Sequence, residues 1–273
     1  MDKSSWLGIF VALGGILAGM TLEGGKVIQV LQPTAAMIVF GGTLGAVMLQ
    51  FPLPLVISSF KALPGVFFRK GEKLEAQMQQ IVGFAQKARK QGIVSLDGDL
   101  AGVADPFLKK SLMLAIDGTD SQDLRNIMEL EMDNLAARDE QVPKVFEAAG
   151  GYSPTVGILG AVLGLIEVMQ HLNHINEVGR GIAVAFVATI YGVAAANLFY
   201  LPVAGKLKHY AEEAARAREM VLEGTISILE GMNPRMLETK LRAYCGPQGP
   251  AEAPAAEAQG VPEMAGQPSQ AAG

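Results

Sequence analysis

Charge and cysteine are both scarce in this sequence. Asp, Glu, Lys and Arg together make up 18% of its 273 residues, and the net charge is −5 at pH 7. The single cysteine, Cys245, excludes an intrachain disulfide framework and a thiolate metal cluster. No basic stripe with interleaved aromatic residues is present, which argues against a nucleic-acid partner.

The motifs of nucleotide and metal chemistry are missing as well. The stretch Gly19–Gly24 has the glycine spacing of a phosphate-binding loop, but Gly25 stands where such a loop has lysine. We interpret His171 and His174 as solvent-exposed polar residues, because only two carboxylates lie near them in the sequence, and we expect no metal site. The sequence therefore predicts neither an enzyme nor a bound cofactor.

What the sequence does contain is four long windows without a charged residue. They cover residues 4–22, 27–60, 148–166 and 181–205. Each is at or near the length of about 20 apolar residues that crosses a bilayer core, which excludes a simple soluble enzyme. We predict an all-α membrane protein with four transmembrane helices, at about residues 4–22, 34–58, 152–172 and 181–204.

Lysine and arginine at the ends of the windows predict the orientation. Lys3 precedes the first window, and clusters of basic residues follow the second, precede the third and follow the fourth. The opposite side carries only Lys26 and Arg180. We therefore expect a multi-pass protein of the inner (plasma) membrane with both termini in the cytoplasm, helices 1 and 2 in residues 1–60, and helices 3 and 4 in residues 148–205.

Most of the remaining charge lies between helices 2 and 3. Residues 61–147 hold 12 basic and 14 acidic residues, and apolar positions at helical spacing, as in Leu74–Arg89, predict a helical cytoplasmic domain suited to docking a protein partner. Residues 206–245 predict a cytoplasmic helical tail that is broken near Asn233-Pro234. Residues 246–273, rich in Pro, Ala, Gly, Gln and Glu, predict a disordered tail.

Two prolines near the membrane have different expected roles. Ser153 and Pro154 suit the start of the third helix, with the serine as cap and the proline in the first turn. Pro202 lies in the last turns of the fourth helix and removes the amide that would bond the Leu198 carbonyl. We expect a kink there and treat Pro202 as a candidate hinge.

Small residues recur four positions apart within the windows. In a membrane this spacing lets helix backbones approach closely, so we expect tight packing among the spans. The pairs are Gly15 and Gly19, Gly41 and Gly45, Gly160 and Gly164, and Gly192 and Ala196.

Ionisable side chains are absent from the middle of every predicted span. A proton or ion path through a bilayer normally includes such a residue near the midplane. If this chain forms an ion path, another subunit must supply the titrating group.

Four segments together resemble a known family, the MotA flagellar stator subunits within the MotA/TolQ/ExbB proton channels. The likeness covers roughly residues 5–245. It is carried by Gly157–Ile166 preceded by Pro154, Gly181–Gly192 followed by Leu201-Pro202, Gly41–Gly45 and Glu230–Arg235.

The resemblance implies a stator subunit that forms an ion channel with MotB and converts ion-motive force into torque. It implies a pentamer of this chain around a MotB dimer, in which MotB brings the membrane Asp that carries the ion and a domain that grips peptidoglycan. The rotor protein that receives the torque would be FliG.

The resemblance also assigns expected roles to residues in the spans. Pro154, with Thr155 beside it, and Thr189 fall on the ion pathway. Sodium-driven members of the family commonly have a threonine where this sequence has Ala161, which favours protons as the transported ion. Pro202 falls on a family proline near the coupling to the cytoplasmic domain.

The rotor interface of the family matches the segment Lys87–Asp97. Arg89 falls on the key basic residue, with Lys90 beside it. Asp97 stands where glutamate is usual, and its shorter side chain changes the reach of that contact.

Two other functions fit parts of the pattern. A TolQ/ExbB-like proton-channel subunit that energises an outer-membrane system shares the last two spans, but such proteins typically have three spans and an outward N-terminus, which the charge pattern opposes. A solute transporter is disfavoured because no broken helix pair or inverted repeat surrounds a polar midplane site.

Overall fold

The computed structural model describes residues 3–68, 74–170, 172 and 175–245. Within these ranges the chain is helical and contains no strand, which confirms the predicted all-α class. The predicted disordered tail, His171 and His174 lie outside the described residues.

The elements are α1 (Lys3–Leu22), η1 (Val27–Val30), α2 (Pro33–Ala36), η2 (Met37–Gly41), α3 (Gly42–Gln50), α4 (Leu53–Phe68), α5 (Leu74–Gln91), η3 (Ile93–Gly102), α6 (Pro106–Ile116), α7 (Ser121–Asp139), α8 (Gln141–Gln170), α9 (Ile175–Ala194), η4 (Ala195–Tyr200), α10 (Leu201–Leu229), α11 (Pro234–Arg242) and η5 (Ala243–Cys245).

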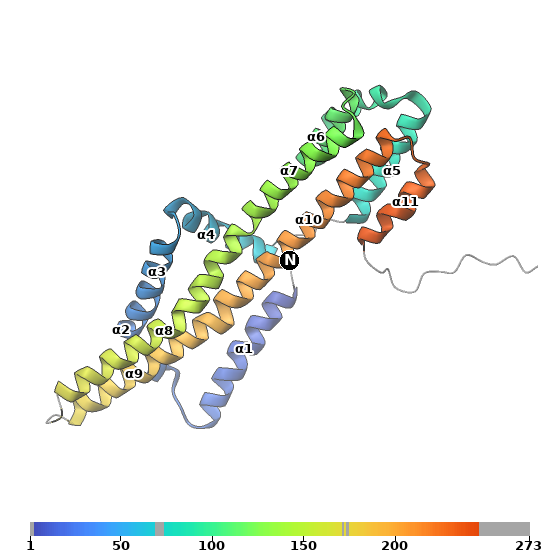
Figure 1. Ribbon diagram of the computed structural model, residues 1–273. Helices are drawn as coiled ribbons and strands as arrows, with labels where there is room; N and C mark the ends of the chain where they lie inside the picture. Colours follow the sequence, from blue (N-terminus) through green and yellow to red (C-terminus); the bar gives the residue numbers. More distant parts are fainter. Residues whose placement is uncertain (1–2, 69–73, 171, 173–174, 246–273) are drawn as a thin grey trace, which may run out of the picture.

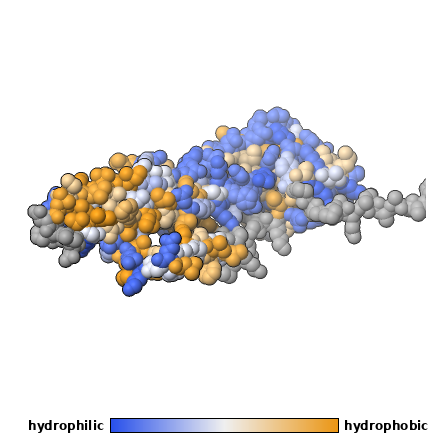
Figure 2. All heavy atoms as spheres, turned by 90° about the horizontal axis from the view of Figure 1, so that it is seen from below, coloured by the Kyte–Doolittle hydropathy of each residue, from blue (hydrophilic) through white to orange (hydrophobic). Residues whose placement is uncertain are grey.

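A long helical hairpin forms the axis of the molecule (Figure 1). One arm is α7 followed by α8, and the other is α9, η4 and α10, which continue one another without a loop. The two arms pack along their length, α8 against α9 and α7 against α10. Hydrophobic surface gathers at one end of the molecule and hydrophilic surface at the other (Figure 2). We call these the apolar end and the polar end.

Three helices in the described part of the chain are long and apolar enough to cross a membrane. The first is Pro33–Gln50, and the other two are the apolar stretches of the long arms. Trp6–Leu22 and Leu53–Phe68 are shorter apolar helices. The sequence predicted a first span over residues 4–22, and α1 occupies that range as a continuous helix.

The helix predicted over residues 34–58 is shorter than expected. It ends at Gln50, because Phe51 is extended (φ −121°, ψ 146°) immediately before Pro52. A residue before proline is forced out of the helical region by the proline ring, so the chain breaks there. A new helix, α4, starts at Leu53 and carries the rest of the predicted segment.

The polar end has its own hydrophobic core. Helix α5 buries Met78, Ile81, Val82 and Ala85, as the helical spacing of Leu74–Arg89 predicted. They pack with residues of η3, α6, α7, α10 and α11 in one cluster. The predicted break in the tail is also found, since α10 ends at Leu229 and α11 starts at Pro234.

Candidate functional site

Helices α8 and α9 pack with their backbones in contact. A Cβ atom on Gly192 would lie 2.6 Å from the carbonyl oxygen of Ser153, and one on Gly164 would lie 2.9 Å from the carbonyl oxygen of Gly181. A Cβ atom on Gly160 would lie 2.8 Å from the Cβ of Ala188. Only glycine allows this approach, so the close packing expected from small residues is confirmed for this pair of helices.

The other predicted small-residue pairs behave differently. A Cβ atom on Gly15, Gly19, Gly41 or Gly45 would meet nothing within 4 Å. These glycines therefore make no close helix contact within the described part of a single chain. The expectation of tight packing is wrong for these two pairs within one chain.

Pro154 does not start a helix, contrary to the sequence prediction. Helix α8 begins at Gln141 and continues through Pro154, which lies in its interior. Ser153 is therefore not a cap, and its hydroxyl is fully buried without a hydrogen-bond partner. Because proline has no amide hydrogen, the regular bond from position 154 to the Gly150 carbonyl cannot form. The surrounding apolar packing keeps the helix continuous across this gap.

Three of the four candidate ion-pathway residues lie on one side of the hairpin, and Thr155 lies about 100° around α8 from Pro154. Val156 of α8 meets the helix Pro33–Gln50, which follows α1 and which we call the second apolar helix, because a Cβ atom on Gly42 would lie 2.7 Å from the Val156 side chain. Val187 and Tyr191 of α9 pack against the same helix. Residues two positions apart point to nearly opposite sides of a helix. Pro154, two before Val156, therefore points away from the second apolar helix.

Thr189 and Ala161 share that direction. Thr189 lies two residues from both Val187 and Tyr191, so it too points away from the second apolar helix. Ala161, seven positions after Pro154, falls on the same stripe of α8. Pro154, Ala161 and Thr189 are all half-buried, at the edge of the α8–α9 contact.

The surface around these three residues is apolar and open. Ile158 is 58% exposed and Phe186 is 69% exposed, and both lie on the same side of the hairpin. Thr189 donates a hydrogen bond to the Ala185 carbonyl (3.3 Å), and Thr155, which is exposed, donates to the Tyr152 carbonyl (2.8 Å). We call this surface the hairpin face. Among the described residues it holds hydroxyls but no acid or base.

The hydroxyl of Tyr191 holds the opposite side of the hairpin. It donates to the Val30 carbonyl and accepts from the Gln32 amide at 3.3 Å. Tyr191 thereby ties α9 to the loop before α2. Local sequence patterns do not reveal this role of Tyr191, because its partners are 159 and 161 positions away.

A wide helical turn precedes Pro202. The residues Ala195–Tyr200 form a π-helical segment, η4, between α9 and α10. A π-helical turn gives new hydrogen-bond partners to backbone groups that lose their regular partners near a proline. Close by, a Cβ atom on Gly150 would lie 2.6 Å from the Leu201 side chain. The sequence predicted a kink near Leu198, and the structure has a π-helical segment at that position.

The predicted rotor-contact residues lie at the far side of the polar end. Arg89 and Lys90 are exposed in the last turn of α5, and Asp97 is exposed on η3. Gly92, at φ +84°, turns the chain between them. Leu96 and Leu100 are buried, which fixes η3 to the core and keeps Asp97 at the surface. The neighbouring Lys87 is occupied by an ion pair with Asp99 (2.7 Å).

Comparison with known families defines the class of protein. Residues 100–220 match the model of the MotA/TolQ/ExbB proton channel family, and residues 6–92 match the motility protein A N-terminal model. With the uncharged hairpin face, these matches define a subunit of a membrane ion channel.

Individual relatives identify the branch of that family. Motility protein A of Bacillus subtilis is 36% identical over 89% of this chain and 91% of its own length. The structure titled C. jejuni MotAB has a TM-score of 0.85 at 30% identity and covers 89% of this chain and 96% of that one. The flagellar MotAB stator complex from Bacillus subtilis has a TM-score of 0.82 at 34% identity, with the same two coverages. The chain belongs to the motility protein A family: it is a stator subunit of the bacterial flagellar motor and a protein of the inner membrane.

Proposed function

We propose that the hairpin face lines the ion path of the stator and that a membrane segment of MotB lies against it. The observation that carries this proposal is the chemistry of the face: exposed apolar side chains surround Pro154, Ala161 and Thr189, and no described residue of the face is ionisable. A titrating carboxylate from a second protein would complete the path. Both solved relatives above are complexes that contain MotB.

We further propose that the transported ion is a proton. Ala161 offers no oxygen to coordinate a sodium ion, and Thr155 and Thr189 both direct their hydroxyl hydrogens to backbone carbonyls of their own helix. One elementary charge crossing 100 mV releases about 2.3 kcal/mol, which is enough to change the packing of a helix pair. Protonation of the MotB Asp would change how it sits against Pro154 and Thr189.

The membrane arrangement that we propose has four spans. They are α1, the helix from Pro33 to Gln50, the apolar half of α8, and α9 with η4. Lys3 is the first residue of α1 and Lys206 lies in α10 just after η4, and we propose that both mark the cytoplasmic ends of their spans. The polar end would then be a cytoplasmic domain. Five copies around a MotB dimer would cover the apolar side chains that a single chain exposes.

Torque would leave the complex through Arg89, Lys90 and Asp97. They are exposed at the polar end, away from the hairpin face, and would meet oppositely charged residues of FliG. Single exposed ion pairs are weak and screened by salt. Weak contacts suit a stator that must release the rotor and bind it again at each step. Pro202 and η4 lie between the ion path and this contact and would serve as the hinge.

The experiment that tests the proposal starts from a strain that lacks this gene. We expect flagellated cells that do not swim and that recover with the intact copy. Thr189→Val keeps the shape of the side chain and removes its hydroxyl. If that hydroxyl contributes about 1 kcal/mol to ion passage, swimming speed at limiting ion-motive force falls about fivefold.

The matched control for Thr189→Val is Thr239→Val. Thr239 donates the same kind of bond to a carbonyl four residues earlier, but it is exposed on α11. We expect this variant to swim normally. Equal amounts of both variants in the membrane with equal swimming speeds would contradict a role for the hairpin face in ion passage.

A further inference from the structure

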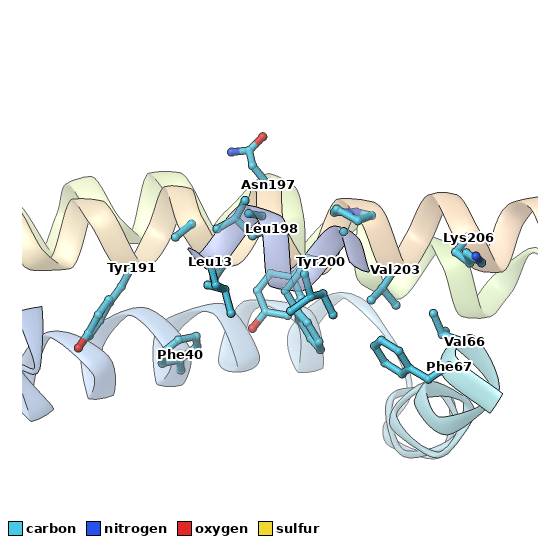
Figure 3. A pocket seen from close by; sticks show the side chains of 17 residues that line it. Leu13, Phe40, Val66, Phe67, Tyr191, Asn197, Leu198, Tyr200, Val203 and Lys206 are labelled. Carbon is cyan, nitrogen blue, oxygen red and sulfur yellow. The ribbon is translucent and has the colours of Figure 1, made fainter. Parts of the chain in front are cut away.

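A deep apolar groove separates α1 from the long arm that contains η4 (Figure 3). Its volume is about 880 Å³. Aromatic side chains line it from several elements, among them Phe40 of η2, Phe67 of α4 and Tyr200 of η4. We call it the α1 groove. None of its lining residues is Pro154, Ala161 or Thr189, so the α1 groove is separate from the hairpin face.

The α1 groove covers only half of the membrane depth. On the long arm it runs from Tyr191 to Lys206, which is about 22 Å at 1.5 Å per residue. Tyr191 is near the middle of the uncharged stretch between Arg180 and Lys206. On α1 the lining residues fall within Gly8–Leu13, the first half of that helix. Both walls therefore extend from the bilayer midplane to one surface.

The groove has a charged residue at one end. Among the described residues that line it, Lys206 alone is charged, and Figure 3 shows it at one end of the pocket, with Tyr191 at the other. The Lys206 ammonium lies 5.8 Å from the centroid of the Tyr210 ring, which keeps it near the mouth. An occupant with an apolar body one leaflet long and an anionic head would match this pattern.

We propose that the α1 groove binds one anionic phospholipid of the leaflet on the Lys206 side. Its acyl chains would lie along η4, and its phosphate would meet Lys206. A helix from a second copy of the chain fits less well, because a membrane-crossing helix needs about 20 residues and a groove through both leaflets. The lipid would contact Pro202, which also lines the groove, and would restrain movement of the helix there.

This inference goes beyond the stator function and needs only that the chain sits in a membrane. The test uses the full-length chain purified in mild detergent with whatever partner accompanies it. Phosphatidylglycerol or phosphatidylcholine is added, and native mass spectrometry counts the lipids retained per chain. We expect saturation at one phosphatidylglycerol per chain and weaker retention of phosphatidylcholine. Retention that never saturates, or that is equal for both lipids, contradicts the proposal.

Two variants locate the lipid. Gly8 lines the groove, and a side chain there would enter open space, so Gly8→Leu should fill the groove without disturbing the fold and weaken binding at least tenfold. Gly14→Leu makes the same change on α1 outside the groove. Lys206→Gln should abolish the preference for phosphatidylglycerol, whereas Lys208→Gln should not. If each variant behaves as its control does, the assigned position is wrong.

The alternative occupant is tested by cross-linking in intact membranes. The natural cysteine is removed by Cys245→Ser, and a cysteine is introduced by Gly8→Cys. A second cysteine is introduced in the same chain by Ala195→Cys, and the membranes are then oxidised. If a lipid fills the groove, no disulfide should link two different chains. A high yield of inter-chain product would show that a second copy fills the groove and would overturn the lipid assignment.

Discussion

Glu223 shows how single residues stabilise the polar end. Its carboxylate pairs with Lys240 at 2.6 Å and with Arg125 at 2.7 Å, and its side chain is only 17% exposed. Burial alone would raise the pKa of this carboxyl group, but the hydrogen bonds from Lys240 and Arg125 outweigh it, so the net pKa lies below the ordinary value of 4.5. The three residues tie α7, α10 and α11 together.

The lowered pKa of Glu223 predicts a pH-dependent stability. A carboxyl group with a lowered pKa stabilises the fold above its ordinary pKa, and this stabilisation is lost as the pH falls through the lowered value. Glu223→Gln should therefore cost about 1–3 kcal/mol at pH 7, and the difference from the wild type should shrink as the pH drops below about 4.5. Thermal unfolding between pH 7 and pH 3 measures this.

The control for that series is Glu238→Gln. Glu238 pairs with Arg242 one helical turn away, at 2.8 Å, but the Arg242 side chain is 57% exposed. Exposed pairs of this kind contribute little, so we expect almost no change in the melting temperature at any pH. A Glu223→Gln protein as stable as this control would show that the two ion pairs of Glu223 add nothing to stability.

At the scale of elements, η4 with Pro202 is the feature that links the apolar end to the polar end. Pro202→Ala returns an amide hydrogen to the helix, which allows a regular turn to form and stabilises the helix by up to about 3 kcal/mol. We expect a higher melting temperature, normal membrane levels and slower swimming. Pro64→Ala is the matched control, since Pro64 is also inside a helix but lies in α4. A fast-swimming Pro202→Ala strain would argue against a hinge.

The end of α5 gives a second prediction at this scale. Arg89→Glu reverses an exposed charge and should reduce torque and recruitment of stators to the motor, with an effect that depends on salt. Lys109→Glu reverses an exposed charge on α6 of the same domain and should leave both unchanged. Swimming speed and the number of stators per motor are the measurements. Unchanged torque in Arg89→Glu would remove this residue from the rotor contact.

The elements also show what local sequence patterns can and cannot predict. Helical spacing located α5 correctly, because the buried side of a helix in a soluble core repeats every three or four residues. Pro154 was assigned to a helix start, yet it lies inside α8, where packing against α9 outweighs the lost hydrogen bond. The π-helical segments η2 and η4 have no comparable pattern in the sequence, since they depend on how whole helices fit together.

At the scale of the whole molecule, the hairpin face should be the side that meets a second protein. Ile158 is 58% exposed on this face, between Pro154 and Ala161. In a Cys245→Ser background, Ile158→Cys should form disulfides with cysteines placed along the membrane segment of the partner. Leu44→Cys, 42% exposed on α3, should not. Complexes that assemble normally but give no Ile158 product would place the partner elsewhere.

The overall architecture was more accessible from the sequence than the site was. Charge-free windows fixed where apolar helices lie, because bilayer thickness sets their length. The continuity of the two long arms could not be predicted in this way. Neither could the α1 groove, whose walls come from residues as distant as Gly8 and Lys206. Such juxtapositions depend on tertiary packing, which no local pattern encodes.

The uncharged hairpin face has a consequence for the cell that makes this protein. A newly inserted copy carries no ionisable side chain in the middle of its predicted spans, so on the proposed function it would not complete a proton path by itself. The chain would then accumulate ahead of any other component without draining the energy that drives respiration-linked work. Conduction would begin only when a partner supplies a carboxylate, which would tie conductance to completed assembly.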